Sequence, residues 1–218
     1  MKPSQSVVGR LFFFVLVIAS CSNETETISQ ARMQDAKELP TVLCLDNGVF
    51  DVRAAQKVRD ELGDRNLKGE RLLDIASALD SAASECVSAE SRPNVEILGA
   101  IYVSLGNRLL TDKDFQTASR VFEDADHYYA KYAFPSLMWL EALRGLARAE
   151  TRLGEFRAAA TAASKQTDLA RSWVNREGFV RDALVDALRF EAEVSAAQRQ
   201  TDRAEQLLSE AAQLDSGQ

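Results

Sequence analysis

The chain has 218 residues, of which 46% are hydrophobic, and its formal net charge is −7. A chain of this length can bury one sizeable core, so we expect one main globular domain. An acidic body repels nucleic-acid backbones, and no run of lysine and arginine offsets that charge, so we expect no nucleic-acid partner. Prolines and glycines are few, and the abundance of alanine, leucine, glutamate and arginine favours helices over strands.

The first twenty residues have the pattern of an export signal. An apolar run from Leu11 to Ala19 follows a start that carries two positive charges, and the chain turns polar directly after Cys21. A membrane-spanning helix needs about 20 apolar residues, and this run has roughly half that number, which is typical of a signal peptide. We therefore predict a signal peptide over residues 1–20.

The end of that segment, Ile18-Ala19-Ser20-Cys21, resembles the lipobox of bacterial lipoproteins. The resemblance implies that Cys21 carries lipid, with acyl chains such as palmitate, and becomes the first residue after cleavage. Because Ser22 is not an aspartate, it also implies sorting to the outer membrane, facing the periplasm, in a Gram-negative host. An ordinary signal peptide with an incidental Cys21 and an uncleaved anchor remain the alternatives.

Residues 21–40 are polar and end in Pro40, so we interpret them as the lipidated cysteine and a tether. A flexible linker of this length spans on the order of 25 Å. The folded domain is expected over residues 41–218. Its apolar residues follow the helical spacing of three and four, with breaks at glycine and proline, and no segment resembles a strand. The expected helices cover about 50–62, 72–87, 95–110, 111–133, 137–153, 155–173, 179–199 and 202–214.

These helices form four pairs, and one pair carries a recognisable motif. Its residues are Tyr102-x-x-Leu105-Gly106-x-x-Leu109, followed by Asp114-Phe115, Ala118, Phe122 and Ala125. This pattern resembles the tetratricopeptide repeat (TPR), whose signature is W-x2-L-G-x2-Y followed by A-x3-F. Small side chains at Gly106 and Ala118 would let the paired helices approach closely, and Phe122 would fill the groove between neighbours.

The small positions recur along the chain. Gly106, Ala147 and Ala192 are 41 and 45 residues apart, and so are Ala118, Ala159 and Ala204. The family period is about 34, so the helices must be longer than standard. The resemblance covers about residues 94–214 and implies an all-α fold of TPR-like antiparallel helix pairs stacked as an α-solenoid. A generic helical bundle is the alternative.

Two cysteines remain once Cys21 is assigned to lipid. Cys44 and Cys86 lie at similar distances on either side of an expected turn near Asn66, so an antiparallel hairpin would bring them side by side. An exported protein meets oxidising conditions, where such pairs form disulfides. We therefore hypothesise a Cys44–Cys86 bridge; a buried thiol at Cys86 and an unrelated thiol at Cys44 are the alternative.

Signals for catalysis are absent from the sequence. His127 is the single histidine, no C-x-x-C spacing occurs, and no glycine-rich phosphate loop is present. We expect His127 to be structural, and we expect no enzymatic activity, metal or cofactor. A cluster of aromatic residues around positions 115–139 is expected to pack between helices, with a peptide-binding groove as the alternative.

Three arginines form the sharpest candidate for binding. Arg144, Arg148 and Arg152 are four residues apart and so lie on one stripe of a helix. In TPR proteins the first helix of each pair lines the concave surface, and the same alignment places Asn107 and Arg189 there. Such a surface could bind an acidic segment or a terminal carboxylate. The alternative is a solvated face paired with local acids such as Glu141.

The expected function is a lipid-anchored periplasmic scaffold that binds another envelope protein or peptide. A binder of a small molecule or cell-wall fragment is the second hypothesis, and it requires a deep cavity between helix pairs. An enzyme is the third, disfavoured because the motifs for a nucleophile, metal or phosphate are missing.

Overall fold

The computed structural model describes residues 49–63, 92–133, 135–177 and 181–216, together with positions 43, 72, 75, 76, 79 and 84. All of them belong to the second of two units into which the chain divides, Pro40–Gln218. The predicted signal peptide, the lipid on Cys21, the tether and the bridge between Cys44 and Cys86 lie outside the described residues and stay predictions.

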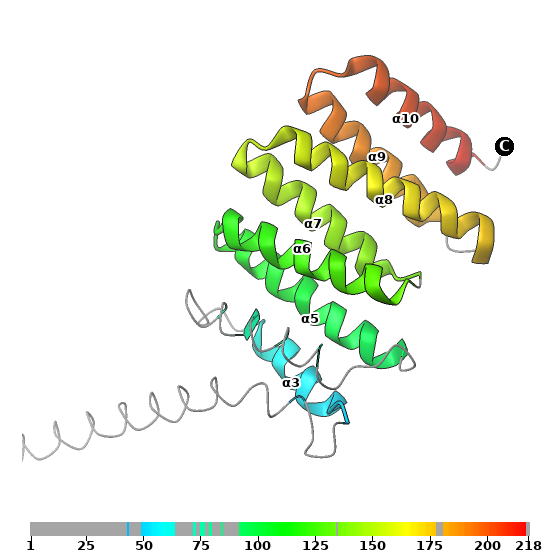
Figure 1. The fold of residues 1–218 in the computed structure, drawn as a ribbon. Helices are drawn as coiled ribbons and strands as arrows, with labels where there is room; N and C mark the ends of the chain where they lie inside the picture. The colour runs from blue at the N-terminus through cyan, green and yellow to red at the C-terminus, as the bar shows by residue number, and fades with distance from the viewer. Residues whose placement is uncertain are drawn as a thin grey trace, which may run out of the picture. The chain divides into compact units, whose positions relative to one another are not determined.

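The described part of the chain is a series of helices stacked in chain order (Figure 1). From α5 to α10 each helix packs against the next, and α7 also contacts both α5 and α9. This pattern of pairs stacked on pairs confirms the predicted all-α fold of TPR-like antiparallel pairs. The helices are α3 (Val52–Glu61), α5 (Arg92–Thr111), α6 (Phe115–Tyr132), α7 (Leu137–Leu153), α8 (Phe156–Glu177), α9 (Arg181–Ala197) and α10 (Thr201–Asp215).

Polar side chains set several helix starts. The Asp114 carboxylate accepts from the backbone N–H of Thr117, and the Ser136 hydroxyl accepts from that of Met138, so both residues act as N-caps. The expectation that α6 begins at Thr111 is wrong, because Thr111 is still the last residue of α5 and the cap lies at Asp114. Helix α8 likewise continues to Glu177, beyond the expected end near 173.

The turn inside each pair has the same geometry in all three repeats. Lys113, Gly154 and Arg199 have φ angles of 64°, 83° and 62°, in the left-handed region. In each turn the next N–H bonds a carbonyl five residues back, for example from Glu155 to Glu150 at 2.9 Å, as in a Schellman motif. The three left-handed residues are 41 and 45 residues apart, so the predicted repeat spacing is confirmed.

Glycine and alanine at the helix contacts leave space for large side chains. A Cβ added at Gly106 would lie 2.5 Å from the ring of Phe122, and one added at Gly145 would lie 2.2 Å from it. Phe122 therefore fits between α5 and α7 only because both helices present a glycine. Ala118, Ala147 and other small positions of the motif are fully buried, which confirms the predicted packing role of the repeat residues.

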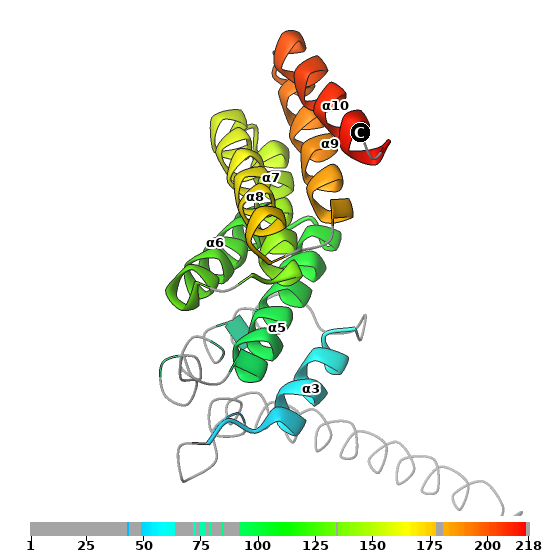
Figure 2. The same cartoon turned by 90° about the vertical axis from the view of Figure 1, so that its right-hand side faces the viewer.

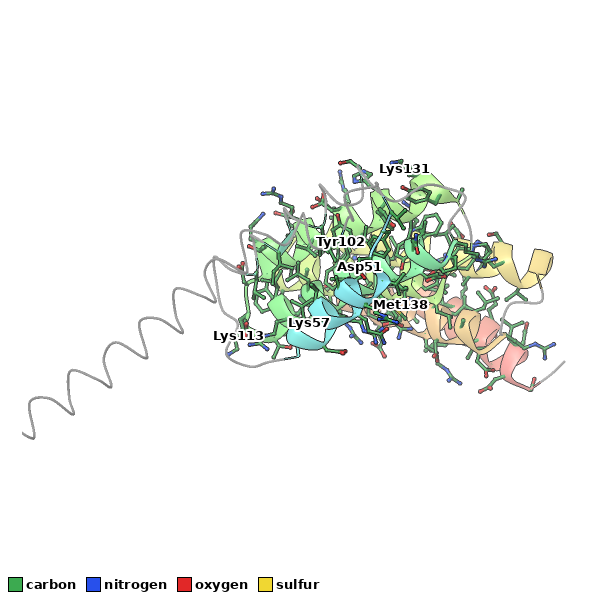
Figure 3. All side chains as sticks on the ribbon, turned by 90° about the horizontal axis from the view of Figure 1, so that it is seen from below. Asp51, Lys57, Tyr102, Lys113, Lys131 and Met138 are labelled. Atoms are coloured by element: carbon green, nitrogen blue, oxygen red, sulfur yellow. The ribbon has the colours of Figure 1, made fainter. Side chains whose placement is uncertain are left out.

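Aromatic rings continue this core from pair to pair. The rings of Tyr102 and Tyr128 are 5.8 Å apart, those of Tyr129 and Trp139 are stacked at 6.1 Å, and Trp139 lies 5.7 Å from Trp173. Figure 3 shows Tyr102 within the body of the stack. These rings are buried, so they pack between helices as expected rather than lining an open groove.

Helix α10 is the last helix of the described series. In both views α3 and α10 lie at opposite ends of it (Figures 1 and 2). Only Ala204, Leu207 and Ala211 of α10 are buried, and its other face is mostly polar, as a terminal repeat requires for solubility. Within the described ranges, no helix combines the length and the apolar character needed to cross a membrane.

Candidate functional site

The first helices of the three pairs present one continuous face. Helices α5, α7 and α9 contact one another in order, and each leaves a stripe of exposed or partly buried residues at helical spacing on the side that the second helices do not cover. We call this surface, made by the exposed and partly buried residues of α5, α7 and α9, the first-helix face. All five predicted binding residues lie on it: Asn107, Arg144, Arg148, Arg152 and Arg189.

Arg144 is the most constrained of the five. Its guanidinium forms an ion pair with Glu141 at 3.3 Å, and its side chain is only 20% exposed. Its Cζ also lies 5.6 Å from the centroid of the Phe190 ring on α9. The Nε atom of Arg144 is buried and has no hydrogen-bond partner among the described residues. The local acid that the alternative interpretation named is therefore present, but it leaves part of this guanidinium unsatisfied.

Arg148 and Arg152 are exposed one and two turns further along α7. The guanidinium of Arg148 lies 5.7 Å from the centroid of the same Phe190 ring. In the described part of the chain neither arginine takes part in an ion pair. The end of α7 that leads into the Gly154 turn therefore carries two cations with no acidic partner there.

Arg189 and Asn107 differ from these arginines. Arg189 forms an ion pair at 2.7 Å with Asp215, at the end of α10, and both side chains are at least half exposed. Its charge is thus already neutralised within the domain. Asn107 is exposed on α5, and its backbone carbonyl accepts a hydrogen bond from the Thr111 hydroxyl.

Phe190 is the residue of this site that the sequence did not reveal. Its side chain is 9% exposed and packs in a cluster with Ala147, Ala163 and Val194. By spacing it resembles any other core residue of α9. Its contact with two arginines depends on how α9 stacks against α7, and no local signal reports that arrangement.

The second helices carry a separate set of charges that join the repeats. The Asp126 carboxylate on α6 accepts hydrogen bonds from Trp139 Nε1 at 2.7 Å and from Lys165 Nζ on α8 at 2.7 Å. Arg171 on α8 reaches Glu210 on α10 at 2.9 Å. These pairs are engaged within the fold, so they hold repeats together and leave little charge for a ligand.

The described residues show little else that resembles a site. His127 is exposed on α6, outside the core. Buried acids have local partners: Ser119 donates to Glu150, and Arg203 pairs with Glu191. No cluster of three potential metal ligands occurs in the described ranges. A hollow of about 630 Å³ runs along α8, but it is open to solvent and lined by that helix alone.

Of the comparisons with known proteins, the one with solved structures gives matches. A scan against family models and a search of curated proteins give no match to this chain. Solved structures do match, among them a Podosopora anserina protein described as a kinesin light chain with nearly identical TPR-like repeats. It is 16% identical, the match covers 85% of this chain and 95% of that one, and the TM-score is 0.49. The stacked-pair architecture itself follows from the helix contacts and the matching turns.

Proposed function

We propose that this protein is a non-enzymatic scaffold that binds an acidic segment of another envelope protein on its first-helix face. The observation that carries the proposal is the pair Arg148 and Arg152, exposed cations that no carboxylate neutralises in the described part of the chain. Guanidinium groups bind carboxylates through forked hydrogen bonds, which makes an acidic segment the matching ligand. Stacked helix pairs offer such extended surfaces to partners.

The same proposal places the domain at a membrane. The lipobox Ile18-Ala19-Ser20-Cys21 supports a lipid on Cys21, and the polar segment over residues 21–40 would hold the helices clear of the bilayer. In a Gram-negative host, Ser22 supports the periplasmic side of the outer membrane. The partner would then be another protein of the envelope.

Affinity capture from detergent-solubilised membranes tests the binding face. The bait is the full, lipidated chain, and the variant is Arg144→Ala combined with Arg148→Ala. Arg120→Ala combined with Arg157→Ala is the matched control, because both residues are exposed on second helices. We expect wild type and control to retain the same partner, identified by mass spectrometry, and the Arg144/Arg148 variant to lose it. Equal recovery by all three baits would show that the first-helix face is not the binding surface.

A binder of a small molecule or cell-wall fragment receives less support. That function requires a deep cavity with converging polar groups. The hollow along α8 is open and has one wall, with Thr161, Ser164 and Ser172 as its hydroxyl groups. No observation on the described residues therefore favours this second function over the first.

A further inference from the structure

Two guanidinium groups of α7 gather around one aromatic ring of α9. The Cζ atoms of Arg144 and Arg148 lie 5.6 Å and 5.7 Å from the centroid of the Phe190 ring, within the range of cation–π attraction. Because the two arginines are one helical turn apart, their side chains could otherwise spread away from each other. The shared ring instead directs both cations to one place on the first-helix face.

The ring is a rigid support because its other contacts are in the core. Phe190 is 9% exposed and packs against alanines of α7 and α8 and against Val194 of its own helix. Side chains in a close-packed interior hold their positions, so the ring cannot follow the arginines if they move. Arg144 and Arg148 are therefore restrained by Phe190, rather than Phe190 by them.

A guanidinium that lies over a ring still has its N–H donors free at its edges, where a carboxylate can bind them. Arg148 has no acidic partner within the described ranges. Arg144 is paired with Glu141 at 3.3 Å and its Nε is buried, so a carboxylate can reach Arg144 through its remaining terminal N–H groups. Asp215 neutralises Arg189 on the neighbouring helix, so Arg148 is the unpaired cation that lies beside the Phe190 ring.

We propose that Phe190 is a positioning residue that holds Arg144 and Arg148 together as one binding site for the carboxylates of an acidic polypeptide segment. This inference rests on the proposed function and adds to it the residue that organises the site. Because the ring orders two long side chains before binding, binding has to remove less conformational entropy. Loss of the aromatic ring therefore weakens the affinity even though both charges remain.

Fluorescence anisotropy with labelled hexaglutamate, and with hexalysine as the opposite-charge control, tests the role of Phe190 on the full chain. Phe190→Leu and Phe190→Met keep an apolar side chain but remove the ring, and each is expected to weaken hexaglutamate binding about tenfold. Phe190→Tyr keeps the ring face and is expected to bind within about twofold of wild type. Arg148→Ala is expected to weaken binding, and Arg120→Ala to leave it unchanged.

Thermal unfolding of each variant separates an effect on binding from an effect on stability. If Phe190 had only a structural role, its replacement would change the melting temperature, and Phe190→Tyr would not restore the affinity for hexaglutamate. The inference is wrong if Phe190→Leu or Phe190→Met binds hexaglutamate as wild type does while Arg148→Ala does not; the arginine site would then stand without Phe190. If Arg148→Ala also binds as wild type does, the proposed binding face itself is wrong.

Discussion

At the scale of single residues, Tyr128 is an example of a buried polar group that does not stabilise the protein through a hydrogen bond. Its ring packs against Tyr102 and Tyr132, but its hydroxyl is buried without a hydrogen-bond partner among the described residues. Burial first, and then the negative charges that neighbouring tyrosines and Glu96 would carry, raise the pKa of Tyr128 well above its ordinary value of 10.0.

This raised pKa lowers the free energy of unfolding at alkaline pH. Below pH 10 Tyr128 is neutral in both states and has no effect on pH dependence; above it, the unfolded chain ionises first, so the free energy of unfolding falls as the pH rises. Tyr128→Phe should make that fall shallower in urea titrations between pH 8 and 11. Since the hydroxyl is unpaired, the substitution should cost less than about 1 kcal/mol at pH 7. A larger loss at pH 7 would show that the hydroxyl has a partner.

At the scale of elements, the turns between paired helices show how one geometry accommodates different residues. The turn of the second pair uses Gly154, which adopts a positive φ without steric cost, whereas the first and third use Lys113 and Arg199. An L-residue in this conformation costs roughly 1–2 kcal/mol. The missing glycine also explains why the start of α6 was misplaced, because Lys113 does not signal a helix end.

We expect Lys113→Gly and Arg199→Gly each to raise the free energy of unfolding by up to about 1 kcal/mol, because glycine removes the strain of the left-handed conformation. Gly154→Ala should lower it by a similar amount, and since nothing lies within 4 Å of the added Cβ, the loss is conformational. Urea unfolding measures all three. Lys113→Ala is the control, since it removes the side chain but keeps the strain. Equal gains from alanine and glycine at position 113 would contradict the explanation.

At the scale of the whole molecule, the first-helix face carries the unpaired arginines Arg148 and Arg152, and the last helix, α10, has a mostly polar outer surface. Ion pairs between second helices, such as Asp126 with Lys165, join successive repeats. In the proposed function, lipid on Cys21 fixes the first-helix face near a membrane.

The anchor is tested by labelling cells with radioactive palmitate and isolating the protein. We expect wild type to incorporate label and to sediment with membranes, because the Cys21 thiol is the predicted acceptor. Cys21→Ser should abolish incorporation, and Cys44→Ser, the matched control, should retain it. Label that persists in Cys21→Ser would assign the lipid to another residue or exclude this type of anchor.

Much of the architecture could be predicted because it depends on local patterns. Helical spacing of apolar residues, the break before Ser136, the stop at Gly154 and the small residues at Gly106 and Ala147 are read within a few neighbouring positions. Repetition at 41 and 45 residues then placed the helix pairs in order. The predicted binding residues on α5, α7 and α9 were placed on one face by the same register.

Only the tertiary structure decided which of those residues are free to bind. Phe190 meets Arg144 and Arg148 because α9 stacks against α7, and Asp215 neutralises Arg189 because α10 packs against α9. Gly145 likewise matters only because Phe122 of another helix lies against it. Such contacts join residues from different helices, and the relative position of helices is set by packing across the whole stack rather than by any local pattern.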